Sequence, residues 1–270
     1  MATRDVTGAR HALLAGLIDH AALFPPASLP MDAAIEVDRA ARATPHAWML
    51  HRFLVPASRL VELPADFDPP LGVVVDVDEL PPLSPQVEVL EARLERAPVV
   101  AGAAARVFLE VPAGDQEALD AVAEHGAGAK VRCGGATSDM FPSPVELARF
   151  VCGCRDRGLA FKATAGLHHP LRGEYRLTYE EGSPHGMMFG FLNVFLAAAF
   201  ARTGLTLKEL ALLLEEKDAD AFQFTETSAS WRGNTVSRTE ISAVRHHVAL
   251  SFGSCSFQEP VDDLRSLGLL

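Results

Sequence analysis

The chain has 270 residues, of which 49% are hydrophobic and 22% are charged, a balance that can support a packed core. Its formal net charge of −11 argues against nucleic acid or an anionic membrane as a partner, although a few local arginines or lysines can still bind a small anionic substrate. No apolar run reaches the roughly 20 residues that are needed to span a bilayer.

The start of the chain predicts mature protein and not a signal peptide, because Asp19 and His20 interrupt its short apolar stretch. The four cysteines, at positions 133, 152, 154 and 255, show no zinc-type pairing and fit reduced thiols. We therefore expect a soluble cytoplasmic protein. The sequence leaves open whether it forms a homo-oligomer.

Short apolar strands alternate with helical patterns along the chain, which is typical of a parallel α/β sheet. The predicted strands are residues 19–24, 48–55, 72–77, 87–94, 106–111, 129–133, 160–165 and 249–254. Eight strands with helical stretches between most of them favour a closed (β/α)8 TIM barrel over an open sheet. The loops at 62–70 and 81–85 are too short to separate domains, so residues 1–270 are expected to form one TIM-barrel domain.

Helical patterns are clearest in the second half of the chain. They predict helices at residues 115–125, 143–158, 189–203, 206–216 and 238–248. Ser143 is a favourable N-cap, Pro144 suits the first helical position, and Gly158 stops the helix. Residues 222–236, around Trp231, predict a β-hairpin inserted before the last helix and strand.

Two lysines, Lys130 and Lys162, occupy consecutive predicted barrel strands and lie 32 residues apart, which is one βα repeat. Burying an unpaired ammonium is costly, and two lysines side by side would lower the pKa of at least one of them. A lysine that is neutral near pH 7 can attack a carbonyl and form a Schiff base, which acts as an electron sink. The alternative is that each lysine pairs with a neighbouring carboxylate such as Glu110.

Five short motifs stand at or near these strand ends: Arg-Val-Phe-Leu-Glu at 106–110, His-Gly-Ala-Gly-Ala-Lys at 125–130, Gly-Ala-Thr at 135–137, Phe-Lys-Ala-Thr-Ala-Gly at 161–166 and Gly-Ser-Cys-Ser at 253–256. Together they resemble the deoxyribose-phosphate aldolases, which are class I, Schiff-base TIM-barrel lyases. The resemblance implies that Lys130 is the Schiff-base nucleophile, that Lys162 is its electrostatic partner and that Glu110 ends a strand in the site. It also implies a phosphate-binding turn formed by Gly253, Ser254, Cys255 and Ser256.

The chain also departs from that family. Arg132 and Cys133 stand where the family has small hydroxyl residues, and Leu-His-His-Pro at 167–170 stands where it has glycines and an arginine. The family's aspartate on strand four has no clean match, Glu88 and Glu91 being the nearest candidates. We therefore expect a substrate other than deoxyribose phosphate.

Further candidates come from strand parity and strand ends. Arg132 shares the parity of Lys130, so it should face the same side of its strand and either bind a carboxylate or phosphate or pair with Glu110. His168 and His169 follow a strand end, where barrel enzymes keep acids, bases and ligands. Either histidine can be a general base, one of them can be a ligand, or both can be ordinary loop residues.

Two positions are left undecided by the sequence. Asp19 and His20 become site candidates only if the first strand precedes them. The turn at 253–256 precedes a predicted helix start, where backbone N–H groups can bind an anion, but small residues also serve tight strand–helix packing. Cys255 is either a reactive thiol near that helix or a buried, inert one.

The leading hypothesis is a class I aldolase or related Schiff-base lyase that acts on a small anionic carbonyl compound and needs neither cofactor nor metal. The alternative is a metal-dependent barrel isomerase or hydrolase that uses His168 and His169 with strand-end carboxylates. A third reading is a barrel that binds a ligand without catalysis.

Overall fold

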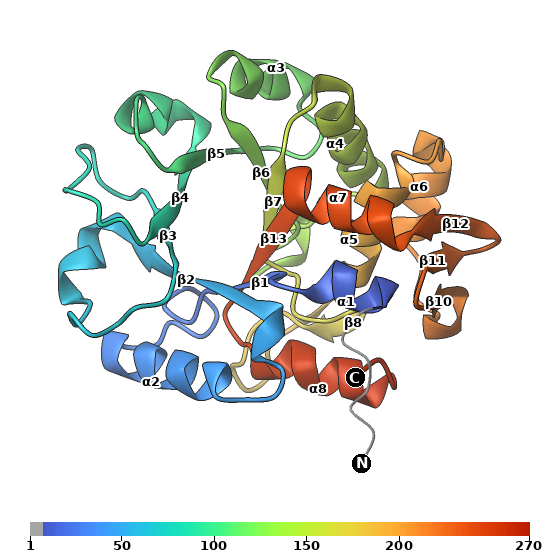
Figure 1. Ribbon diagram of the computed structural model, residues 1–270, viewed down its shortest axis with the longest axis horizontal. Coiled ribbons are helices and arrows are strands. Elements are labelled where there is room, and N and C mark those ends of the chain that lie inside the picture. Colours follow the sequence, from blue (N-terminus) through green and yellow to red (C-terminus); the bar gives the residue numbers. More distant parts are fainter. Residues whose placement is uncertain (1–7) are drawn as a thin grey trace.

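The computed structural model describes residues 8–270, so the first seven residues of the predicted mature N-terminus lie outside the described part. Eight parallel strands close into a barrel in the order β1-β13-β7-β6-β5-β4-β3-β2 (Figure 1). They are β1 (Ile18–His20), β2 (Leu50–Pro56), β3 (Leu71–Val74), β4 (Val87–Arg93), β5 (Arg106–Val111), β6 (Gly128–Arg132), β7 (Phe161–Thr164) and β13 (Ala249–Ser254). The predicted TIM-barrel fold is confirmed. Only β1 differs clearly from its predicted span, since it begins before Asp19 and ends at His20.

Helices cover the outside of the barrel, with α3 and α4 on one side and α2 and α8 on the other (Figure 1). They are α1 (Ala9–Leu14), α2 (Met31–Arg42), α3 (Gln116–Glu124), α4 (Pro144–Arg157), α5 (Phe191–Phe200), α6 (Leu207–Leu214), α7 (Arg238–His247) and α8 (Gln258–Ser266). The five predicted helices are confirmed as α3 to α7. In α4 the predicted cap is a full capping box, because Ser143 accepts from the Glu146 amide and the Glu146 carboxylate accepts from the Ser143 amide.

The crossovers between β2 and β5 lack α-helices. Two of them contain only the 3₁₀ helices η2 (Ala57–Glu62) and η3 (Leu94–Val100), and a loop joins β3 to β4. Pro98 lies inside η3, where a proline disfavours a longer α-helix. The barrel is therefore covered unevenly.

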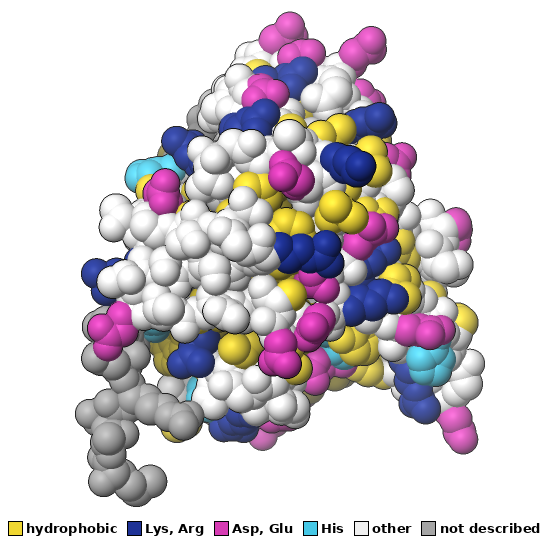
Figure 2. All heavy atoms as spheres, turned by 90° about the vertical axis from the view of Figure 1, so that its right-hand side faces the viewer, with side chains coloured by type: hydrophobic (Ala, Val, Ile, Leu, Met, Phe, Trp, Pro, Cys, Tyr) yellow, Lys and Arg dark blue, Asp and Glu magenta, His cyan; other side chains and the backbone are white. Residues whose placement is uncertain are grey.

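The long connection from β7 to β13 carries two small antiparallel sheets. One is the hairpin of β8 (Gly173–Arg176) and β9 (His185–Met188), which the sequence did not predict. The other replaces the predicted hairpin at 222–236 with three strands, β10 (Phe222–Phe224), β11 (Ser228–Trp231) and β12 (Asn234–Ser237). On the side of the molecule seen in Figure 2, acidic, basic and apolar side chains are interspersed.

The core has two parts. The larger lies between the strands and the helices, where Phe161 of β7 packs against Phe150 of α4 and Phe195 of α5. The smaller cluster comprises Val89 of β4, Phe108 of β5 and Ala160, which directly precedes β7, with Leu250 packed against it. Polar side chains described below lie beyond this cluster toward each end of the barrel. Within residues 8–270, no helix is long and apolar enough to cross a membrane.

Candidate active site

A cavity of about 540 Å³ opens at the C-terminal ends of the barrel strands. We call this end the C-terminal mouth. The lining includes six polar side chains from five strands and the loops that follow them: Glu91, Glu110, Lys130, Arg132, His168 and Cys255. In TIM barrels this end collects side chains from several strands, so the cavity is the natural candidate for an active site.

The two lysines lie directly opposite each other, because Lys130 pairs with Lys162 in the register of β6 and β7. The Lys130 Nζ is 2.9 Å from Glu91 Oε2 and 3.1 Å from Glu110 Oε2. The Lys162 Nζ is 2.5 Å from both Asp19 Oδ2 and Glu91 Oε1. Glu91 therefore bridges the two ammonium groups, and the predicted pairing of each lysine with carboxylates is what the structure shows.

These ion pairs shift the pKa values of the buried groups. Burial by itself would lower the pKa of Lys130, but the charges of Glu91 and Glu110 outweigh burial and raise it. Burial would likewise raise the pKa of Glu91, but Lys130 and Lys162 lower it to about 2. The sequence predicted a lowered pKa for at least one of the two lysines; Lys130 is not that lysine, because Glu91 and Glu110 pair with it.

Asp19 belongs to this network. It is fully buried in β1, and its carboxylate accepts a 2.6 Å hydrogen bond from the Ser251 hydroxyl in addition to contacting Lys162. Burial would raise its pKa, but Lys162 and Arg52 hold it well below its usual range. His20 faces the other way and contacts Asp38 of α2, with 2.9 Å between Nδ1 and Oδ1. The sequence left both residues open, and the structure puts Asp19 alone beside the lysines.

Of the two candidates on strand four, only Glu91 reaches the lysines. Glu88 lies near the other end of β4, where it pairs with His51 and Arg52. Glu88 and Glu91 are three residues apart on β4, and this separation along the strand accounts for their different environments.

Arginines line the outer part of the cavity. Arg132 lies 4.0 Å from Glu110, a distance too long for a firm ion pair, and its side chain is 45% exposed. Arg93 and Arg96 also line the cavity, and the sequence analysis did not single them out. Strand parity could have predicted this position for Arg93, since it follows Glu91 by two residues and so points to the same side of β4.

His168 takes part in a cluster at the edge of the cavity. Its Nδ1 lies 3.1 Å from Glu259 Oε2 and 3.8 Å from the Cys255 sulfur, and the Tyr179 hydroxyl contacts both partners at 2.9 and 3.5 Å. Burial would lower the pKa of His168, but Cys255 and Glu259 raise it to about 10. Burial would raise the pKa of Cys255, and the hydrogen bond from His168 lowers it instead. Each group of the pair thus favours the charged form of the other.

His169 does not share this position. Its Nδ1 contacts Asp263 of α8 at 2.6 Å, and its ring stacks on Tyr175 of the β8–β9 hairpin at 3.5 Å. The two neighbouring histidines therefore hold different parts of the structure, and the geometry brings only His168 to the cavity.

The turn at 253–256 is partly used by the fold itself. Gly253 and Cys255 line the cavity, whereas the Ser254 hydroxyl donates to the Ser256 carbonyl at 2.6 Å and the Ser256 hydroxyl accepts from the Glu259 amide. Neither Ser254 nor Ser256 is among the residues that line the cavity, so the predicted role of these two side chains in binding substrate gains no support. Any anion held at this turn would depend on backbone N–H groups and the nearby arginines.

Metal binding gains no geometric support, because residues 8–270 contain no group of three or more His, Cys, Asp or Glu side chains placed to hold an ion. His168 and His169 are instead engaged with carboxylates of α8. Comparison of the chain with protein-family models and with curated proteins finds no match.

Proposed function

We propose that this barrel is a Schiff-base lyase of the class I aldolase type, acting on a small carbonyl compound that carries a carboxylate or phosphate. The observation that carries the proposal is Lys130, an amine in the wall of the cavity with two carboxylates within 3.1 Å of its Nζ. The resemblance of the lysine-bearing strands to deoxyribose-phosphate aldolases points to the same chemistry.

The carboxylates provide the route for the proton that Lys130 must lose. Only the neutral amine can attack a carbonyl carbon, so the ammonium first transfers a proton to a neighbouring base. Both Glu110 and Glu91 line the cavity, but Glu110 suits this role better because it contacts one lysine whereas Glu91 is held by two. Attack of the amine then gives a carbinolamine, and loss of water gives the iminium.

The iminium draws electrons from the adjacent carbon–carbon bond. A base removes the proton of the β-hydroxyl group, the bond breaks, an aldehyde leaves, and the electron pair remains on the lysine-bound enamine. Protonation of the enamine carbon and hydrolysis by water then release the second product and restore Lys130. Glu110 and His168 line the same cavity and are the groups placed to move these protons.

Lys162 is a positioning residue in this proposal. It is 1% exposed and holds Glu91 and Asp19 in place below Lys130, without lining the cavity. Arg132, Arg93 and Arg96 supply the positive charge that would hold an anionic substrate at the opening, and guanidinium groups suit carboxylate and phosphate oxygens.

The test is borohydride trapping. The protein is incubated with a panel of small aldehydes and keto acids, reduced with borohydride and examined by intact and peptide mass spectrometry. We expect a covalent adduct on Lys130 that disappears in Lys130→Ala and weakens in Lys162→Ala. Lys208→Ala, an exposed lysine on α6, is the matched control and should leave trapping unchanged. No adduct on Lys130 with any carbonyl compound would refute the proposal.

A further inference from the structure

A larger cavity, of about 920 Å³, lies at the opposite end of the barrel. We call this end the N-terminal mouth, because the first residues of β2, β5 and β13 border it, together with α1 and α7. Fifteen residues of the described range 8–270 line it, of which eight are arginine or histidine and none is acidic. In a chain with a net charge of −11, this concentration of basic side chains is unusual.

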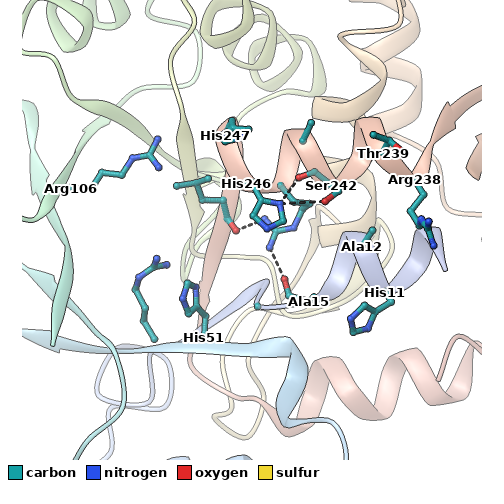
Figure 3. Close-up of a pocket in the computed structure, with 15 residues that line it drawn as sticks. His11, Ala12, Ala15, His51, Arg106, Arg238, Thr239, Ser242, His246 and His247 are labelled. Atoms are coloured by element: carbon teal, nitrogen blue, oxygen red, sulfur yellow. Dashed lines mark hydrogen bonds between the residues drawn. The ribbon is translucent and has the colours of Figure 1, made fainter. Parts of the chain in front are cut away.

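The basic side chains come from separate elements and meet around the same hollow. Figure 3 shows His51 of β2, Arg106 of β5 and His246 of α7 around it, with His11 of α1 at the far side. Arg106 is exposed at the rim, and its guanidinium lies 5.4 Å from the Phe108 ring of the inner apolar cluster. The cavity is thus a concave surface on rigid elements, as small-molecule sites usually are.

Arg245 gives the clearest sign that a negative charge is missing. Its side chain is 6% exposed, and its guanidinium donates to the carbonyls of Leu13, Ala15, Ala249 and Leu250. Among residues 8–270, no carboxylate lies within ion-pair distance of it. The Phe195 ring also lies 5.3 Å from the guanidinium carbon. The carbonyls and the ring stabilise the guanidinium, but neither carries a net negative charge, and burying a cation without a directly paired anion is costly inside a protein.

A second arginine adds to the same positive potential. Arg52, also a lining residue, pairs with Glu88 at 2.8 Å and lies 3.5 Å from Asp19. Burial and the charge of Arg52 together lower the pKa of Arg245 to about 9, against the opposing charge of Asp19. Burial and Arg52 also lower the pKa of Arg106. Among residues 8–270, the carboxylates that pair with these three arginines are Glu88 and Asp19, both on Arg52, and Asp19 is shared with Lys162.

We propose that the N-terminal mouth is a binding site for a small polyanion that carries phosphate groups. Arginines bind phosphate oxygens through paired N–H donors, and the Ser242 and Thr239 side chains in the lining add hydroxyl groups. The cavity is large enough for a ligand of nucleotide size. Such a ligand would supply the counter-charge that Arg245 lacks.

The site is distinct from the proposed lyase site. The apolar cluster of Val89, Phe108 and Ala160 lies inside the barrel, and the two cavities share no lining residue. Binding at the N-terminal mouth therefore does not depend on whether Lys130 forms a Schiff base, and the experiment below measures binding without any reaction.

The experiment is calorimetric titration of the full chain with pyrophosphate at about 0.15 M salt, with folding of each variant checked by circular dichroism. We expect saturable binding of one pyrophosphate that weakens at least tenfold in the double variant Arg106→Gln, His246→Gln. Ala243→Glu places a carboxylate in the lining and should abolish this binding. Both variants alter exposed positions, so the fold should be retained.

Two control variants locate the ligand. Arg149→Gln removes an exposed arginine on α4, away from both cavities, and should leave the affinity unchanged. Arg132→Gln removes an arginine from the C-terminal mouth and should likewise leave this binding intact. Loss of binding in Arg132→Gln with retention in Ala243→Glu would place the ligand at the other cavity and overturn the proposal. Absence of saturable binding would overturn it as well.

Binding of a longer polyanion distinguishes a small-molecule pocket from an extended charged surface. We expect a twelve-nucleotide single-stranded RNA to bind no more tightly than pyrophosphate, because the basic side chains converge in a cavity. Affinity that rises steeply with oligonucleotide length would indicate a nucleic-acid surface and would contradict a small-molecule site.

Discussion

Buried charged side chains are paired differently at the two mouths of the barrel. At the C-terminal mouth, Lys130 and Lys162 are matched by three carboxylates within 3.1 Å. At the N-terminal mouth, the buried Arg245 donates to neutral carbonyls and lies over the Phe195 ring, and among residues 8–270 no carboxylate is within ion-pair distance of it. The first arrangement is complete within the chain, whereas the second gains from an anion that comes from outside. Buried charges that are paired within the chain, such as the two lysines, therefore need no ligand, whereas a buried charge without a paired carboxylate, such as Arg245, favours binding of an anion.

Arg52 connects the two regions. It lines the cavity at the N-terminal mouth and lies 3.5 Å from Asp19, which contacts Lys162. Lys162 in turn shares Glu91 with Lys130. A continuous series of ion pairs thus runs along the inside of the barrel from one mouth to the other.

The largest expected effect is on stability at the C-terminal mouth. Lys162→Met removes the buried cation between Asp19 and Glu91 and leaves two fully buried carboxylates facing each other. We expect the free energy of unfolding to fall by about 3–5 kcal/mol, measured by urea denaturation near pH 7. Arg106→Gln at the N-terminal mouth should change it by less than about 0.5 kcal/mol, since that side chain is exposed. An equal decrease in the free energy of unfolding in the two variants would contradict this difference between the two mouths.

The next effect is on the pH dependence of trapping at Lys130. Because its carboxylate neighbours raise the pKa of Lys130, the neutral amine is a minor species near pH 7 and grows as the pH rises. The initial rate of borohydride-trapped adduct should therefore increase about tenfold per pH unit between pH 7 and 9.

Glu110→Gln sharpens this measurement. Removing one carboxylate lowers the pKa of Lys130, so the rise should begin at lower pH, although the loss of the proton acceptor should reduce the plateau rate. A trapping rate that is independent of pH from 7 to 9 would mean that the carboxylates do not hold the proton on Lys130.

Cysteine reactivity tests the ion pair at the edge of the same cavity. Cys255 has a lowered pKa beside His168, whereas burial raises the pKa of Cys133 to about 12 and that of Cys154 further. We expect iodoacetamide to label Cys255 fastest of these three at pH 7, measured by peptide mass spectrometry. His168→Asn should slow that labelling about tenfold.

The pH dependence of the free energy of unfolding tests whether His168 is charged in the folded protein. Its pKa in the folded protein, about 10, lies above its unfolded value near 6.5, so its stabilising contribution is complete below about pH 6.5 and is lost as the pH rises toward 10. The free energy of unfolding should therefore decline between pH 7 and 10 less steeply in His168→Asn than in the parent. Identical slopes would show that His168 is not charged in the folded protein.

The smallest effect concerns the N-terminal mouth. A ligand that binds only the folded state stabilises it by about 1.4 kcal/mol when present at about ten times its dissociation constant. We expect pyrophosphate to raise the thermal midpoint relative to sodium chloride of equal ionic strength. The shift should vanish in Ala243→Glu and persist in Lys130→Ala, which would make the two mouths independent as binding sites.

The sequence by itself determined the fold and most of its elements. Alternating apolar strands and helical patterns predicted the eight barrel strands, and Ser143, Pro144 and Gly158 predicted the limits of α4, because these are local preferences of the backbone. The 32-residue spacing also placed Lys130 and Lys162 on adjacent strands, where the structure pairs them in register.

Tertiary structure alone decided what surrounds those lysines. Asp19 and Glu91 come from strands far along the chain from Lys162, and closure of the barrel brings both within 2.5 Å of its Nζ. Closure likewise brings Glu91 and Glu110 to Lys130, where they raise its pKa. The basic cavity at the N-terminal mouth arises in the same way, from side chains of β2, β5 and α7 that no local pattern relates. Electrostatic environment depends on distance in space, and a linear sequence does not contain those distances.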